Sequence, residues 1–87
     1  MGNIGTPEQK KLLVLLRQIR VDAGLRQEDL AQRLGRPQSF VSKYESGESR
    51  LDLLELQEVC IAVGLKLSDF IRSFEESLNT PKPRNKN

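Results

Sequence analysis

The sequence contains no histidine and no tryptophan, and it has only one cysteine, Cys60, and one tyrosine, Tyr44. Histidine is the most common general base near neutral pH and a frequent transition-metal ligand, so its absence removes the usual basis of an active site or a metal centre. Cys60 has no second cysteine for a disulfide or a zinc site, and we interpret it as a small buried residue of a reduced, cytoplasmic protein. We therefore expect a protein without catalytic activity, metal or cofactor.

Long apolar runs and strand-like alternation are also missing. No stretch of about 18 apolar residues is present, which argues against a membrane partner. No segment alternates apolar and polar residues for long enough to predict a strand. With 87 residues, the chain is expected to form one all-α domain over residues 7–78, between a flexible N-terminus, residues 1–6, and a disordered basic tail, residues 79–87.

Acidic residues are scarce in the first half of the chain and concentrated in the second. The net charge is +2, yet residues 51–78 hold six acidic and only two basic residues, while the tail holds three basic residues and no acidic one. A polyanionic partner would therefore meet the first half of the domain.

Three longer helices are predicted from apolar residues at helical spacing. The first begins after a Thr6 cap and ends at Gly24. The fourth begins after an Asp52 cap and ends at Gly64, and the fifth begins after a Ser68 cap. Their expected core-facing residues are Leu12, Leu13, Leu16, Ile19, Ala23, Leu56, Val59, Cys60, Val63, Phe70, Ile71, Phe74 and Leu78.

Two shorter helices, residues 27–34 and 38–46, are separated only by Gly35, Arg36 and Pro37. A turn of this length containing glycine is typical of a helix-turn-helix, in which the second helix projects its N-terminal side chains into the major groove of DNA. That second helix carries an apolar face with Phe40, Val41 and Tyr44. Away from this face lie side chains suited to base edges or phosphates: Gln38, Ser39, Ser42 and Lys43.

The segment QEDLAQRLGRPQSFVSKYESG, residues 27–47, resembles the helix-turn-helix of the phage-repressor and xenobiotic-response-element (XRE) family. The matching features include Gln27, the Leu30-Ala31 pair, Gly35 and the Gln38-Ser39 pair. The flanking segments extend the resemblance over about residues 10 to 75. It implies a five-helix bundle of the lambda-repressor type that binds double-stranded DNA.

The resemblance also implies roles at matched positions. Bases would be read by Gln38, Ser39 and Lys43, with Ser42 a candidate for a base or a phosphate. Phosphate contacts would come from Gln27, Arg36, Ser46 and Arg50. Arg26 holds the place of the usual Ser or Thr cap and would add a cation near the DNA backbone. Arg20 and Glu45 match a structural arginine–glutamate pair that ties two helices together.

Domains of this kind usually bind inverted repeats as homodimers. Leu54 and Ile61 lie off the core-facing side of the fourth helix, and with Leu65 and Phe74 they form the predicted dimer interface. The expected function is that of a sequence-specific transcriptional regulator, most simply a repressor. The alternative is an antitoxin or adaptor that uses the same apolar surface mainly to bind a partner protein.

Overall fold

The computed structural model describes residues 5–79, which form five helices and no strand, so the predicted all-α class is confirmed for this part of the chain. The expectations for residues 1–4 and 80–87 lie outside the described residues. The helices are α1 (Pro7–Asp22), α2 (Gln27–Leu34), α3 (Gln38–Ser46), α4 (Leu53–Ala62) and α5 (Leu67–Asn79).

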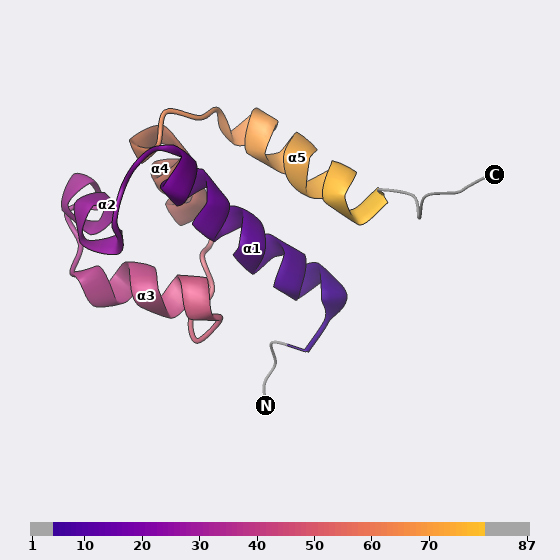
Figure 1. The fold of residues 1–87 in the computed structure, drawn as a ribbon, viewed down its shortest axis with the longest axis horizontal. Helices are drawn as coiled ribbons and strands as arrows, with labels where there is room; N and C mark the ends of the chain where they lie inside the picture. The colour runs from indigo at the N-terminus through magenta and orange to yellow at the C-terminus, as the bar shows by residue number, and fades with distance from the viewer. Residues whose placement is uncertain (1–4, 80–87) are drawn as a thin grey trace.

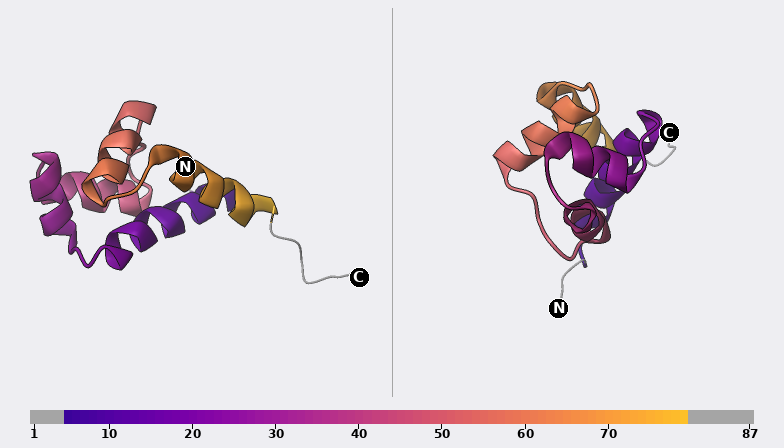
Figure 2. Two further views of the ribbon diagram at one scale, coloured as in Figure 1. Left: turned by 90° about the horizontal axis from the view of Figure 1, so that it is seen from above. Right: turned by 90° about the vertical axis from the view of Figure 1, so that its left-hand side faces the viewer.

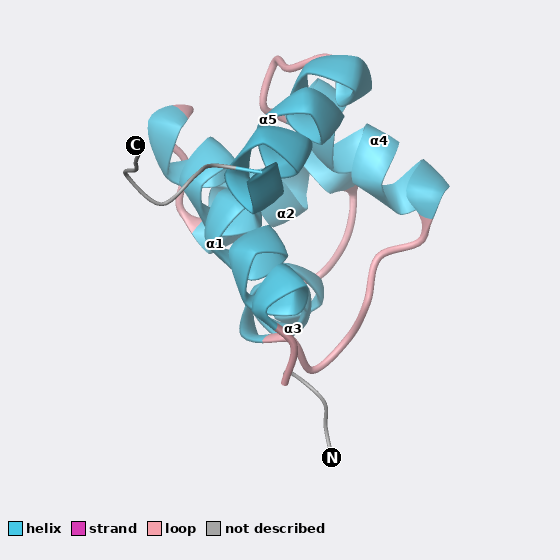
Figure 3. Ribbon diagram, turned by 90° about the vertical axis from the view of Figure 1, so that its right-hand side faces the viewer, coloured by secondary structure: helices cyan, strands magenta, loops and turns pink. Residues whose placement is uncertain are grey.

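Helices α1 and α5 lie side by side, while α2 and α3 form a separate pair across one end of α1 (Figures 1 and 2). Helix α4 contacts both α2 and α5, which places it on the side of the bundle away from α3. The segment that leads from α3 to α4 is extended and passes along the outside of the bundle (Figure 3). Helix α3 is thus held by α1 and α2 and keeps one long face open to solvent.

The core gathers one or two side chains from each helix. Leu30, Val41, Val59 and Cys60 are fully buried, and the other buried core residues are Leu16, Ala31, Tyr44 and Phe70. Cys60 is thus the buried thiol expected from the sequence. No helix within residues 5–79 is long and apolar enough to span a bilayer.

Two of the three helix starts agree with the capping pattern of the sequence. Thr6 Oγ1 accepts a hydrogen bond of 3.0 Å from the backbone N–H of Gln9. Asp52 and Glu55 form a reciprocal capping box, with each carboxylate accepting the backbone N–H of the other residue. The prediction that Ser68 caps α5 is wrong. The N–H of Phe70 bonds to the carbonyl of Lys66, so the helix begins at Leu67 and Ser68 lies inside its first turn.

The turn between α2 and α3 depends on the left-handed conformation of Gly35, whose φ is 68°. In this conformation the N–H groups of Gly35 and Arg36 reach back to the carbonyls of Gln32 and Ala31, which satisfies the last turn of α2. A residue with a Cβ is strained at this φ. The turn therefore requires glycine and determines where α3 begins.

Candidate nucleic-acid interface

The predicted base-reading residues lie together on the open face of α3. Gln38, Ser39 and Lys43 are exposed and Ser42 is half-buried, whereas Val41 and Tyr44 point into the core. Because Gln38 and Ser39 open the helix, they stand at the end that a helix-turn-helix presents to base edges.

A buried ion pair holds α3 against α1. Arg20 Nε and Nη2 donate to the two carboxylate oxygens of Glu45 at 2.7 and 3.0 Å, and Arg20 Nη1 donates to the carbonyl of Leu25 at 2.8 Å. The side chains are only 10% and 5% exposed. The hydrogen bond to Glu45 raises the pKa of Arg20 above its ordinary value. The structural pairing implied by the family resemblance is therefore present.

The ion pair continues into a chain of hydrogen bonds that reaches the open face of α3. Gln27 Nε2 donates to Glu45 Oε1 at 3.1 Å, and Gln38 Nε2 donates to Gln27 Oε1 at 2.9 Å. Gln27, expected only to contact a phosphate, thus also joins the buried pair to the first residue of α3.

The chemistry of the chain determines which way each amide faces. The Glu45 carboxylate is occupied by Arg20 and only accepts hydrogen bonds, so Gln27 must turn its NH₂ group toward it. The carbonyl oxygen of Gln27 then faces Gln38, so Gln38 must donate a hydrogen bond to it from its own NH₂ group. The carbonyl oxygen and the second N–H of Gln38 remain for an external partner.

The other polar residues of α3 are held less firmly. Ser42 Oγ donates to the carbonyl of Ser39 at 3.3 Å, and Ser46 Oγ donates to the carbonyl of Lys43 at 3.0 Å. Ser46 Oγ also accepts the N–H of Glu48 at 3.3 Å. Both serine hydroxyls are thus engaged with the backbone. The ammonium group of Lys43 has no carboxylate partner among the described residues and remains a free cation on this face.

Arg26, expected as a cation beside the DNA backbone, is paired with two carboxylates in the first turn of α2, the helix that it precedes. Its guanidinium group contacts Asp29 at 3.0 Å and Glu28 at 3.3 Å. The Asp29 carboxylate also accepts the backbone N–H of Arg26 at 2.9 Å, so the N–H of the residue that replaces the usual Ser or Thr cap is satisfied. The side chain and backbone of Arg26 lower the pKa of Asp29 to about 2.

Arg36 turns toward α4. Its guanidinium carbon lies 4.4 Å from the centre of the Phe40 ring, and its nitrogens lie 3.8 Å from Glu55 and 3.9 Å from Glu58. The stacking on Phe40 directs Arg36 to these carboxylates. In this structure the predicted phosphate ligand is therefore part of the contact between the turn and α4. Glu55 and Glu58 supply the carboxylates of that contact.

Arg50 does not join the group around α3. It lies in the segment between α3 and α4 and reaches toward the N-terminal half of α1, beside Gln9 and Leu12. It has no carboxylate partner among residues 5–79.

The four residues of the predicted dimer interface are not on one surface. Leu54 and Ile61 are 68% and 69% exposed on α4, and Leu53 beside them is 64% exposed. Leu65 instead packs against the core, because its N–H bonds back to the carbonyl of Cys60 and folds the loop inward. Phe74 is half-buried on α5.

The sequence predicted candidate residues for the interface but not the hydrogen bonds that link them. The link requires that Glu45, from the third turn of α3, reaches the N-terminus of α2. The available signal was that glutamine opens both short helices, at positions 27 and 38.

Comparisons with known proteins agree with this geometry. Residues 16–70 match the sequence profile of the family described as helix-turn-helix. Among solved structures, an XRE-family like protein from Pseudomonas syringae pv. tomato str. DC3000 is 44% identical, with a TM-score of 0.74 over 83% of this chain and 85% of that one. A structure of the clp gene regulator ClgR from Corynebacterium glutamicum is 25% identical, with a TM-score of 0.71 over 83% of this chain and 92% of that one. A comparison with curated protein sequences finds no match.

The fold and the open face of α3 define a helix-turn-helix domain, the class of protein that reads DNA with its second short helix. Within that class, the chain belongs to the XRE-type helix-turn-helix family.

Proposed function

We propose that this protein is a sequence-specific DNA-binding transcriptional regulator that inserts α3 into the major groove and reads an inverted repeat as a homodimer. The single observation that carries the proposal is the chain of hydrogen bonds from the buried ion pair to Gln38. A core-filling or solvated helix does not need its first side chain oriented through two other helices. Occupation of a promoter by such a dimer represses transcription.

The free atoms of Gln38 match one base pair in particular. Gln38 offers a carbonyl acceptor and an N–H donor side by side, and adenine presents the complementary N6 donor and N7 acceptor in the major groove. Ser39 and Ser42 are suited to neighbouring bases or phosphates, and Lys43 to a guanine or a phosphate. We therefore expect an A·T pair in each half-site at the position that Gln38 reaches.

The predicted phosphate contacts of Arg26 and Arg36 require a rearrangement, because both side chains are paired with carboxylates in the free protein. To reach a phosphate, each must give up these surface pairs, which contribute little to stability because solvent screens them. We propose that Gln27 and Ser46 approach the backbone from the ends of α2 and α3, with Lys43 as the cation that is already free.

The experiment begins with selection of a binding site from a pool of random duplexes. Fluorescence anisotropy then compares the selected duplex with a scrambled one over a series of salt concentrations. Gln38→Ala is expected to weaken binding to the selected duplex by about 1–3 kcal/mol and to relax one base position. Gln18→Ala is the matched control, because Gln18 is exposed on α1 and bonds only to Asp22 within its own helix. Equal loss on both duplexes would show that Gln38 reads no base.

The homodimer would use the exposed apolar residues of α4. Leu54 and Ile61 are seven positions apart on the same helix, and Leu53 extends the patch. We retain Phe74 as a peripheral contact and leave out Leu65, which is half-buried against the core of its own subunit. Sedimentation equilibrium of Ile61→Glu tests this surface, with Val14→Glu as the control at a residue of similar exposure on α1. Dissociation by both variants or by neither would refute the assignment.

The alternative function, an antitoxin or adaptor that binds a partner protein, relies on the same patch. If the chain binds a single DNA site tightly as a monomer, the patch of Leu53, Leu54 and Ile61 is not needed for a homodimer. That result would favour a partner protein as the molecule that covers this patch.

A further inference from the structure

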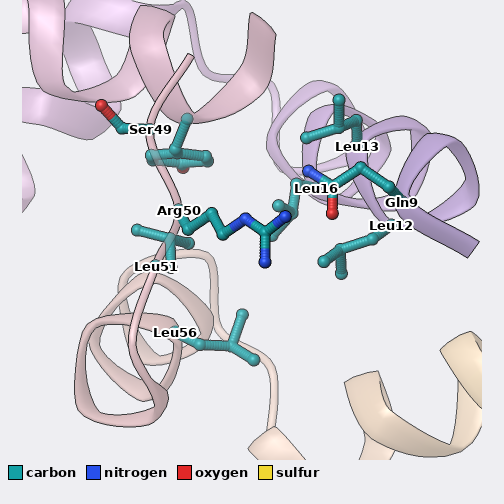
Figure 4. Close-up of a pocket in the computed structure, with 9 residues that line it drawn as sticks. Gln9, Leu12, Leu13, Leu16, Ser49, Arg50, Leu51 and Leu56 are labelled. Atoms are coloured by element: carbon teal, nitrogen blue, oxygen red, sulfur yellow. The ribbon is translucent and has the colours of Figure 1, made fainter. Parts of the chain in front are cut away.

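An apolar cavity of about 230 Å³ lies between the N-terminal half of α1, the segment that joins α3 to α4, and α4. Its walls are mainly leucine side chains, and Figure 4 shows them facing one another from the three segments: Leu12, Leu13, Leu16, Leu51 and Leu56. A dry cavity of about 150 Å³ in another protein holds benzene, so this one has room for roughly nine non-hydrogen atoms.

Tyr44 forms part of the same wall and is only 1% exposed, yet its hydroxyl has no hydrogen-bond partner within residues 5–79. An unsatisfied buried hydroxyl is costly. Burial also raises the pKa of Tyr44, which keeps the phenol neutral. The hydroxyl is itself inaccessible to solvent, so a ligand in the cavity would meet the apolar part of Tyr44 and the leucine side chains.

Arg50 provides a charge at the same cavity. Figure 4 shows its guanidinium group extending from the linking segment toward Gln9 and Leu12 of α1. It has no carboxylate partner in the described part of the chain, unlike Arg20, Arg26, Arg36 and Arg72. A guanidinium group in this position selects an anionic head group, preferably a carboxylate that accepts two N–H bonds.

We propose that this cavity binds a small amphipathic monocarboxylate, with its carboxylate on Arg50 and its hydrocarbon body among the leucines. The cavity lies on the opposite side of Tyr44's helix from the base-reading face, so the site is independent of the proposed DNA function.

Octanoate is the probe, because its hydrocarbon tail is within the size that the cavity holds. Tyr44 is the reporter: it is the only tyrosine, there is no tryptophan, and its side chain lines the cavity. Tyrosine emission and ¹H–¹³C methyl spectra of the full chain are followed during titration. We expect saturable changes in both, with the methyl shifts centred on Leu12, Leu13 and Leu51.

The carboxylate contact is tested by a neutral ligand and by a variant. 1-Octanol is expected to bind about tenfold more weakly than octanoate, and Arg50→Gln to weaken octanoate by about tenfold while leaving octanol unchanged. Arg17→Gln is the matched control, since Arg17 is exposed on the outer side of α1 and does not line this cavity.

Three results would overturn the proposal. One is an absence of saturable change at millimolar octanoate. Another is equal weakening by Arg50→Gln and Arg17→Gln, which would mean non-specific attraction of an anion. The third is a set of nuclear Overhauser contacts from Met1 or Ile4 to Leu13 and Leu51 in the free chain, which would assign the cavity to the protein's own N-terminal residues.

Discussion

Removal of one partner of the buried Arg20–Glu45 pair should affect both stability and DNA reading. The substitution Glu45→Leu leaves the guanidinium group of Arg20, whose side chain is 10% exposed, without its carboxylate. Stranding one charge of a buried pair costs about 3–5 kcal/mol. A domain of this size has a total stability of about 4–13 kcal/mol. The melting temperature should therefore fall by about 12–40 °C.

The double variant Arg20→Met/Glu45→Leu separates the two roles of the pair. Replacement of both charges by apolar residues of similar volume is often neutral or stabilising, so the double variant should regain most of the lost stability. It does not restore the acceptor for Gln27, and the amide of Gln38 then loses its fixed orientation. We expect a well-folded protein whose preference for the selected duplex over a scrambled one falls by about 1–3 kcal/mol.

Thermal unfolding by circular dichroism and anisotropy on the two duplexes measure these effects on the same samples. Gln18→Ala again serves as the control for an exposed hydrogen bond. A double variant that is stable and keeps its full sequence preference would refute the role of the pair in orienting Gln38. A Glu45→Leu variant that melts within a few degrees of the parent protein would show that the Arg20 charge is not stranded in a buried site.

Three further predictions follow from single features of the structure. Gly35→Ala places a Cβ at a φ of 68° and should lower stability by about 1–2 kcal/mol, measured by urea unfolding; an unchanged midpoint would refute the strain. Asp29 should titrate with a pKa of about 2 in the folded protein, measured by ¹³C NMR, and this pKa should rise in Arg26→Ala. Because the pKa is lower in the folded than in the unfolded protein, the contact of Asp29 with Arg26 stabilises the fold above about pH 4, and this stabilisation is lost as the pH falls toward 2. Tyr44 has a raised pKa from burial, so the folded protein should show no tyrosinate absorbance at pH 10, and its stability should fall as the pH rises further; tyrosinate in the native state at pH 10 would contradict this.

Most of the helix bounds could be predicted from residues close together in the sequence. The bounds of α2 and α3 agree with the positions of Gly35 and Gly47, because a glycine in the left-handed conformation ends a helix without help from distant residues. The start of α5 was misplaced because Ser68 is a good cap in isolation, whereas the chain already turns into the helix at Lys66. A capping side chain is a preference, and a packed loop can override it.

The contacts made by the candidate site residues were less predictable from the sequence than the helices. The exposed face of α3 follows from the helical spacing of Phe40, Val41 and Tyr44, so it was accessible from the sequence. The pairing of Arg36 with Glu55 and Glu58 was not accessible, because α3 and the segment after it separate these residues and packing decides the path of that segment. The position of Leu65 against the core was also not accessible from the sequence, because packing decides the path of the loop between α4 and α5.

The sequence by itself determined an all-α domain, the position of the helix-turn-helix and the identity of the side chains on its open face, because each depends on residues close together along the chain. Only the tertiary structure decided how those side chains are oriented. Arg20, Gln27 and Glu45 come from three different helices, and their hydrogen bonds exist only when α1, α2 and α3 are packed. The direction in which Gln38 presents its amide is a property of that packing, since an isolated α3 would leave the side chain free to rotate.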